Sequence, residues 1–205
     1  MAYRPEVLDV GAGGTGLAVA GTSGNVLTSN GTIWSSSSPA LGNWVKLQTL
    51  TASTSATLTF TSTYITSTYS SYVVIMNAIV SDGTSGAFGM TVSTNNGSSY
   101  LSTGYVGSAM YLVYNTAVGA FTAVTSTSDF NILVGSDTGE NNGTLWLYNL
   151  ATTKSPSILG DFWAKSLYWQ KAIGYNTTTT AINNIKFAFD AGNIASGNLT
   201  LYGIT

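Results

Sequence analysis

The stretch Ile185-Lys186-Phe187-Ala188-Phe189 places a large apolar side chain at every second residue, with lysine and alanine between them. This period of two is typical of a β-strand that turns one face to a core and the other to solvent. The pattern predicts about nine or ten antiparallel strands and no helix. It recurs at Leu58/Phe60, Phe88/Met90/Val92 and Phe130/Ile132/Val134.

Turn residues separate these stretches at short intervals. Gly and Asn accept the positive φ angles that tight hairpin turns need, so pairs of them predict where the strands end. Many short antiparallel strands within 205 residues predict an all-β fold, an antiparallel β-sandwich. The predicted turns are Asp82-Gly83, Asn95-Asn96-Gly97, Asp137-Thr138-Gly139 and Asn142-Gly143.

Two predicted strands break the alternation, because residues 72–76 and 145–148 are apolar at every position. Such a strand is either covered on both sides or turns one face to another subunit. A sandwich normally leaves one face of each sheet in water, so we expect an oligomer. The alternative is that a loop or the N-terminal segment of the same chain covers that face.

The composition excludes several classes of function. Only 7% of the residues are charged and the net charge is -2, which leaves no basic surface for nucleic acid. No stretch is long and apolar enough to predict membrane insertion. The absence of His and Cys excludes Ser/His/Asp and Cys/His nucleophiles, structural zinc and disulfides. We therefore expect no enzyme, no cofactor and no resident metal.

Carboxylates are the remaining candidates for acid–base chemistry. Asp137 and Glu140 lie three residues apart in a Gly/Asn-rich loop, where we expect solvated side chains. The alternatives are a weak calcium site in this loop and a pair of catalytic carboxylates. A Gly-x-Gly-x-x-Gly pattern at Gly11, Gly13 and Gly16 lacks the following helix that a dinucleotide site needs.

The composition changes near residue 42. Residues 10–41 are almost entirely Gly, Ser, Thr, Ala and Asn, and such a segment alone buries too little apolar area to offset its ordering entropy. The sequence thus predicts an extended N-terminal arm over residues 1–41 and a β-sandwich domain over residues 42–205.

Aromatic side chains are the candidates for recognition. Trp and Tyr stack on the apolar faces of sugar rings, and the same residues are favoured at subunit interfaces. For each aromatic candidate, contact with a glycan and contact with another subunit are both open interpretations. The candidates for glycan or interface contact are Tyr100, Tyr105, Tyr111, Trp163, Tyr168 and Trp169.

The N-terminal and C-terminal stretches carry a family resemblance. The stretch Val10-Gly11-Ala12-Gly13-Gly14-Thr15-Gly16-Leu17 resembles the Gly-Gly-Thr-Gly segments of tailed-bacteriophage tail fibres and related virion proteins. Residues 187–204 resemble the closing strands of a β-sandwich module of phage fibre and surface proteins. Residues 44–60 and 71–80 fit the opening strands of that module. The resemblance covers most of the chain and rests on structural motifs.

The resemblance implies a jelly-roll-like sandwich, a homotrimer and a location on the virion surface. The arm would dock on other virion proteins, and the sandwich would face outward toward host-cell glycans. The chain would then be a short fibre or a receptor-binding adhesion protein. Within the class of virion proteins, the alternative is a capsid decoration or head-fibre protein. From another class of function, the alternative is a carbohydrate-binding module or a polysaccharide depolymerase. The docking residues would be Tyr3, Arg4, Val7, Leu8 and Val10.

Overall fold

The computed structural model describes residues 14–19, 21–39, 42–83, 86–113, 120–122, 128–136, 139–164 and 168–205. All regular structure in these ranges is β-strand, and the strands are numbered β1 to β14. The chain forms two compact units, Met1–Gly42 and Asn43–Thr205. The docking residues predicted between Tyr3 and Val10 lie outside the described ranges.

The described residues of the first unit form a hairpin. Strand β1 (Val26–Ser29) pairs antiparallel with β2 (Trp34–Ser37). The Oδ1 atom of Asn30 accepts the N–H groups of Thr32 and Ile33, and Gly31 has a φ of 89°, so this turn closes the hairpin. A hairpin thus forms where the composition alone predicts an extended segment. Its apolar side chains are exposed, so it buries little of its own surface.

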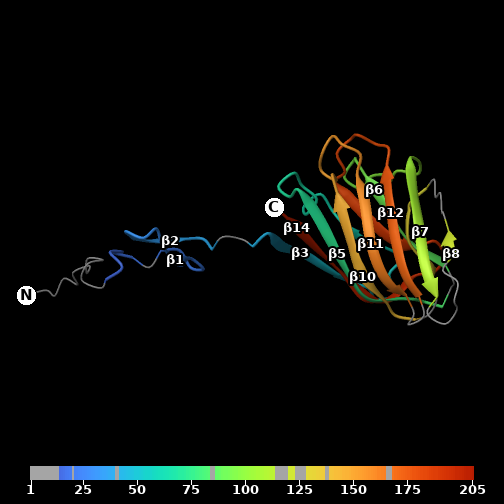
Figure 1. Ribbon diagram of the computed structural model, residues 1–205, viewed down its shortest axis with the longest axis horizontal. Coiled ribbons are helices and arrows are strands. Elements are labelled where there is room, and N and C mark those ends of the chain that lie inside the picture. Colours follow the sequence, from blue (N-terminus) through green and yellow to red (C-terminus); the bar gives the residue numbers. More distant parts are fainter. Residues whose placement is uncertain are drawn as a thin grey trace, which may run out of the picture. The chain divides into compact units, whose positions relative to one another are not determined.

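The second unit is built on two antiparallel sheets, and the predicted all-β, antiparallel class is confirmed. The larger sheet has eight strands in the order β3-β14-β5-β10-β11-β12-β7-β8, and most of them run side by side in Figure 1. The bounds are β3 (Trp44–Thr51), β14 (Ile194–Ile204), β5 (Ser71–Ser81), β10 (Asn141–Tyr148), β11 (Ser157–Ala164), β12 (Tyr168–Asn176), β7 (Tyr105–Val113) and β8 (Ala120–Thr122).

The smaller sheet has four strands in the order β4-β13-β6-β9. Its strands contact the larger sheet from one side, β9 against β7, β11 and β12, and β4 against β3. The two layers therefore form a sandwich with one core between them. The bounds are β4 (Leu58–Phe60), β13 (Asn184–Phe189), β6 (Gly86–Ser93) and β9 (Phe130–Ser136).

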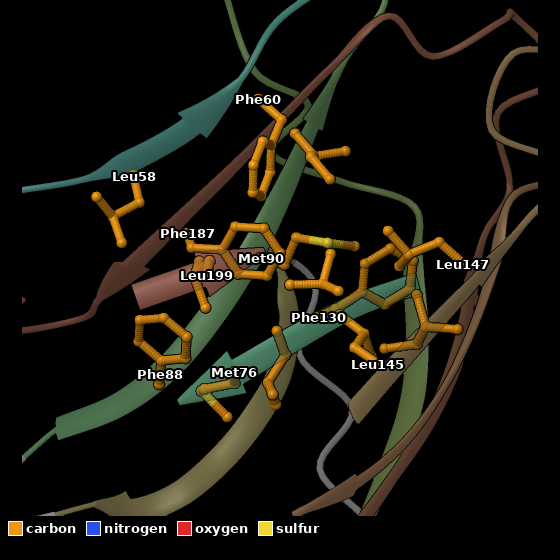
Figure 2. Packing of buried hydrophobic residues seen from close by; sticks show 14 of the residues in the cluster. Leu58, Phe60, Met76, Phe88, Met90, Phe130, Leu145, Leu147, Phe187 and Leu199 are labelled. Atoms are coloured by element: carbon orange, nitrogen blue, oxygen red, sulfur yellow. The ribbon is translucent and has the colours of Figure 1, made fainter. Parts of the chain in front are cut away.

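The core forms from the alternating apolar positions that the sequence predicts. Phe60, Phe88 and Phe187 are fully buried, and the Phe187 ring contacts the other two with centroid separations of 6.3 and 6.0 Å. Met76 and Leu145 of the larger sheet meet this group from the other layer, as Figure 2 shows. The core thus joins both sheets. The side chain of Val134 lies outside the described residues.

Of the four predicted turns, two are confirmed and one is wrong, and Asp137 and Thr138 of the fourth lie outside the described residues. Gly83 and Gly97 have φ angles of 105° and 80°, as turns need. Asn142 and Gly143, in contrast, lie inside β10. A Cβ atom at Gly143 would collide with the ring of Phe162, so this glycine provides space for a core side chain instead of turning the chain.

Candidate functional site

The side of the larger sheet that faces away from the core carries many large apolar side chains, beside a mostly polar row that runs from Thr200 to Lys171. In β5, Tyr72 and Val74 belong to the core, so Val73 between them points to the opposite side. Val73 is nevertheless fully buried. It lies beside Trp146 of β10 and Tyr202 of β14, whose side chains share that side.

The strand register extends this side across the sheet. Trp146 lies opposite Leu159 of β11, and Leu159 lies opposite Ile173 of β12. Next in the sheet, Tyr175 of β12 lies opposite Val106 of β7. We call this surface the outer apolar face. It consists of Trp44, Val73, Val106, Trp146, Tyr148, Leu159, Trp163, Trp169, Ile173, Tyr175 and Tyr202.

One half of the outer apolar face is a cluster of rings on β3, β14 and β10. The ring of Trp44 meets Trp146 edge to face at 5.4 Å between centroids and lies 6.0 Å from Tyr202. Trp146 stacks with Tyr148 at 6.3 Å. These separations are typical of favourable aromatic pairs. The rings therefore support one another, and their cover explains the burial of Val73.

The other half lies on β11, β12 and β7 and is more open. Trp163 and Trp169 face each other across β11 and β12. The Nζ atom of Lys171 lies 5.5 Å from the centroid of the Trp169 ring and 3.0 Å from Oδ1 of Asp161. A flat indole ring beside a charged pair offers an apolar surface together with hydrogen-bonding groups. Such a combination can bind either a sugar ring or a protein surface.

Exposure separates this half from an ordinary sheet surface. Ile173 is 50% exposed, Tyr175 45% and Trp163 44%. Large apolar side chains exposed singly are common, whereas here Ile173 and Tyr175 are successive outward residues of β12. Trp163 lies on the neighbouring β11, beyond the Asp161–Lys171 pair. The arrangement can bind another surface by hydrophobic contact, and its paired charges offer a few hydrogen bonds at one point.

The candidate aromatics separate into three groups. Trp163 and Trp169 meet on the outer apolar face. Tyr100 is half-buried and lies under the Nζ atom of Lys186 at 4.2 Å, on the outer side of the smaller sheet. Tyr111 and Tyr168 belong to β7 and β12, but their side chains lie outside the described residues.

Tyr105 is a core residue, which corrects its place among the contact candidates. It is 4% exposed, its hydroxyl oxygen accepts the N–H group of Val92 at 3.0 Å, and the hydroxyl donates to the carbonyl oxygen of Leu101 at 3.1 Å. Burial raises the pKa of Tyr105 to about 12. The residue links the two sheets, because it lies on β7 and Val92 lies on β6.

Sequence reasoning missed most of the outer apolar face. Trp44, Ile173, Tyr175 and Tyr202 were not among the candidates. The available signal was the doubly apolar stretch at residues 145–148, which holds Trp146 and Tyr148. The neighbours of that stretch are supplied by strands far away in the sequence.

The described residues offer no metal-binding site as an alternative to the outer apolar face. Among them, no group of three or more His, Cys, Asp or Glu side chains could hold a metal ion. Glu140 is exposed, and its predicted partner Asp137 lies outside the described ranges. No helix in the described part of the chain is long and apolar enough to cross a membrane.

The chain matches no protein-family model, no curated protein and no solved structure.

Proposed function

We propose that this chain is a structural surface protein of a tailed-phage virion, a short fibre or adhesion protein with no catalytic activity. In this proposal the N-terminal arm attaches to the particle and the sandwich faces outward. The observation that carries the proposal is the outer apolar face, a broad contact surface on a rigid sheet. Such a surface suits assembly and adhesion, which need area more than reactive groups.

The order of the strands supports a jelly-roll-like module. Eight of the strands alternate between the sheets in the orders β3-β14-β5-β10 and β4-β13-β6-β9. This is the pattern of two Greek keys wound into a double sheet, an architecture used by viral capsid and lectin domains. Two further hairpins, β7–β8 and β11–β12, extend the larger sheet beyond β10.

The extra hairpins carry the open half of the outer apolar face. Trp163, Ile173 and Tyr175 all lie on β11 and β12, which the eight-strand pattern does not require. Exposed apolar side chains on strands that the basic fold does not need support a role in contact with a partner. We propose that this partner surface belongs to a homotrimer on the virion.

Immunogold electron microscopy of purified phage particles tests the proposal, with antibody raised against residues 42–205. Gold at the tail tip would support a receptor-binding fibre, and gold over the head would support a capsid decoration or head-fibre protein. Absence of gold from intact particles would contradict the virion location. Deletion of residues 1–41 should abolish attachment to particles and leave the sandwich folded, as judged by cooperative unfolding in circular dichroism.

Glycan binding at Trp163 and Trp169 is the second candidate function. The observation that favours it is the charged pair Asp161–Lys171 beside the two indoles, since sugars need hydrogen bonds as well as stacking. Trp163→Ala should abolish retention on immobilised host polysaccharide, and Trp34→Ala, in the first unit, serves as the control. Release of reducing sugar by the wild-type chain would instead indicate a depolymerase.

A further inference from the structure

We propose that the outer apolar face is where copies of this chain pack against one another. The inference names the partner of the candidate site and rests on the multimeric part of the proposed function. It does not depend on the virion location. The exposure, size and chemistry of the face favour this partner, and its charge does not oppose it.

Exposure shows that the second unit does not cover this surface by itself. Ile173 is near the middle of the open half, with Leu159 and Ser108 as its neighbours across β11 and β7. Half of its side chain is nevertheless exposed, and Val106 nearby is 39% exposed. Apolar patches of this extent mark interaction surfaces in soluble proteins.

The size of the face matches a subunit interface. It spans seven strands from β3 to β7, about 29 Å across at the usual strand spacing of about 4.8 Å. Along β12 it extends from Trp169 to Tyr175, about 20 Å at about 3.4 Å per residue. This gives a flat footprint of about 600 Å² before side-chain relief, comparable with about 800 Å² per partner in standard interfaces. The footprint includes the mostly polar row from Thr200 to Lys171.

The chemistry of the face favours a second copy over a glycan. Leu159 and Ile173 lie opposite each other, and neither they nor Val106 on the next strand offers a hydrogen bond to sugar hydroxyls. Homo-oligomer interfaces are more apolar than those of separately soluble partners and hold few charges in their centre. The outer apolar face fits that composition apart from Asp161 and Lys171, which form a neutral pair in the row between Ile173 and Trp169.

Charge does not oppose self-association. Asp161 and Lys171 neutralise each other within one chain at 3.0 Å. On β3, Lys46 adds a single positive charge near the edge of the face. The whole chain carries a net charge of only -2, so two copies repel each other weakly.

The two halves of the face allow a ring of three. In a closed trimer each subunit contacts two neighbours through different patches, whereas a dimer joins identical patches about a two-fold axis. The ring cluster around Trp146 and the open half around Ile173 supply two different patches on one sheet. A dimer would use the whole face for one partner, as the comparison of size assumes, whereas a trimer would divide the face between two neighbours.

Sedimentation velocity of the full chain, over a roughly hundred-fold range of concentration, tests the inference. Wild type should sediment as an oligomer. Ile173→Asp should weaken association by roughly ten- to a hundred-fold, as expected for a charge introduced at an interface centre. Thr59→Asp introduces the same charge at an outward position of the smaller sheet, opposite Lys186, and should leave the mass unchanged.

A second variant separates loss of contact from loss of folding. Val106→Asp alters the same face from β7 and should also dissociate the oligomer, while both variants keep the circular dichroism of the wild type. A wild-type chain that stays monomeric at the highest concentration would overturn the inference, including the case in which its own N-terminal segment covers the face. Full-size oligomers of both folded variants would overturn it too.

The outcomes also separate this inference from the proposed function. An oligomer that both variants dissociate, in a protein absent from phage particles, would sustain the interface and remove the virion proposal. A dimer would sustain the interface and correct the expected trimer. A monomer that binds polysaccharide through Trp163 would contradict the interface and support the glycan function.

Discussion

The two outer faces of the sandwich have opposite chemistry. On the smaller sheet the outward residues Thr59, Lys186 and Thr91 form one row across β4, β13 and β6. On the larger sheet the corresponding kind of row holds Tyr202, Val73 and Trp146. Both sheets keep their inward side chains apolar, so the shared core does not explain this difference.

This difference distinguishes side chains that stabilise the fold from side chains that we expect to contact a partner. The smaller sheet has the ordinary arrangement of polar outward side chains, and Tyr100 from a neighbouring loop lies against Lys186. The larger sheet has aromatic and aliphatic residues at many outward positions, although one outward row, from Thr200 through Thr144 to Lys171, is mostly polar. Several of the apolar side chains are exposed. We attribute that exposure to contact with other copies of the chain.

The largest effect is expected from a charge placed at the base of the outer apolar face. Val73→Asp would bury a carboxylate beneath Trp146 and Tyr202, with no partner there, and should cost at least about 3 kcal/mol of unfolding free energy. Thr59→Asp on the other face should cost less than about 1 kcal/mol. Urea unfolding at matched protein concentration measures both, and equal costs would remove the distinction between the faces.

Truncation of one side chain on each face should give a smaller contrast. Trp146→Ala removes ring contacts with Trp44 and Tyr148 and should lower the unfolding free energy by about 2–3 kcal/mol. Lys186→Ala removes one cation–π contact with Tyr100, worth about 0.5–1 kcal/mol. The same urea titration measures both. A larger cost for Lys186→Ala would contradict the account.

The hydroxyl of Tyr105 links the two sheets beneath these faces. Tyr105→Phe removes its hydrogen bonds with Val92 and Leu101 and should cost about 1–2 kcal/mol near neutral pH. Chemical denaturation of the wild type and the variant measures this cost. An unchanged unfolding free energy would argue against the hydrogen bonds.

Ionisation of the same hydroxyl should make the unfolding free energy depend on pH. Burial raises the pKa of Tyr105 from 10.0 to about 12, and burial also raises the pKa of Tyr72. The folded state thus favours the neutral phenol. The associated stability is fully present below pH 10 and is lost as pH rises toward 12. The unfolding free energy of Tyr105→Phe should fall less steeply than that of the wild type between pH 10 and 12. Identical slopes would contradict the assignment of this pH dependence to Tyr105.

The smallest effect is expected for the ion pair on the open half. Asp161 and Lys171 are 47% and 35% exposed, so solvent screens them. A double-mutant cycle with Asp161→Asn and Lys171→Met, measured in the monomeric Val106→Asp background, should give a coupling below about 1 kcal/mol that decreases with added salt. A larger, salt-independent coupling would show that this pair is shielded from solvent.

The sequence predicted the core well because that information is local. Alternation at Leu58/Phe60 and at Phe187/Phe189 identifies side chains that the structure buries. The Asn142-Gly143 pair misled for a non-local reason. It has the composition of a turn, yet the glycine is needed where the Phe162 ring of the next strand crosses it.

The outer apolar face could be predicted only in part. The doubly apolar stretch at residues 145–148 indicated that one side of a strand meets something besides the core. That Trp44 and Tyr202 join Trp146 depends on β3 and β14 lying in the same sheet as β10. Strand order of this kind is set by pairings between distant segments, which residue alternation does not encode.

Hydroxyl-radical footprinting of the full chain tests the central claim most directly, because it reports which side chains water reaches in solution. We predict that Trp163 and Tyr175 are oxidised several-fold more slowly in the wild type than in the Ile173→Asp variant, while Tyr100 on the other face is oxidised equally in both. Equal oxidation of Trp163 and Tyr175 in the two proteins would contradict the account, since it would show that the outer apolar face stands free in water.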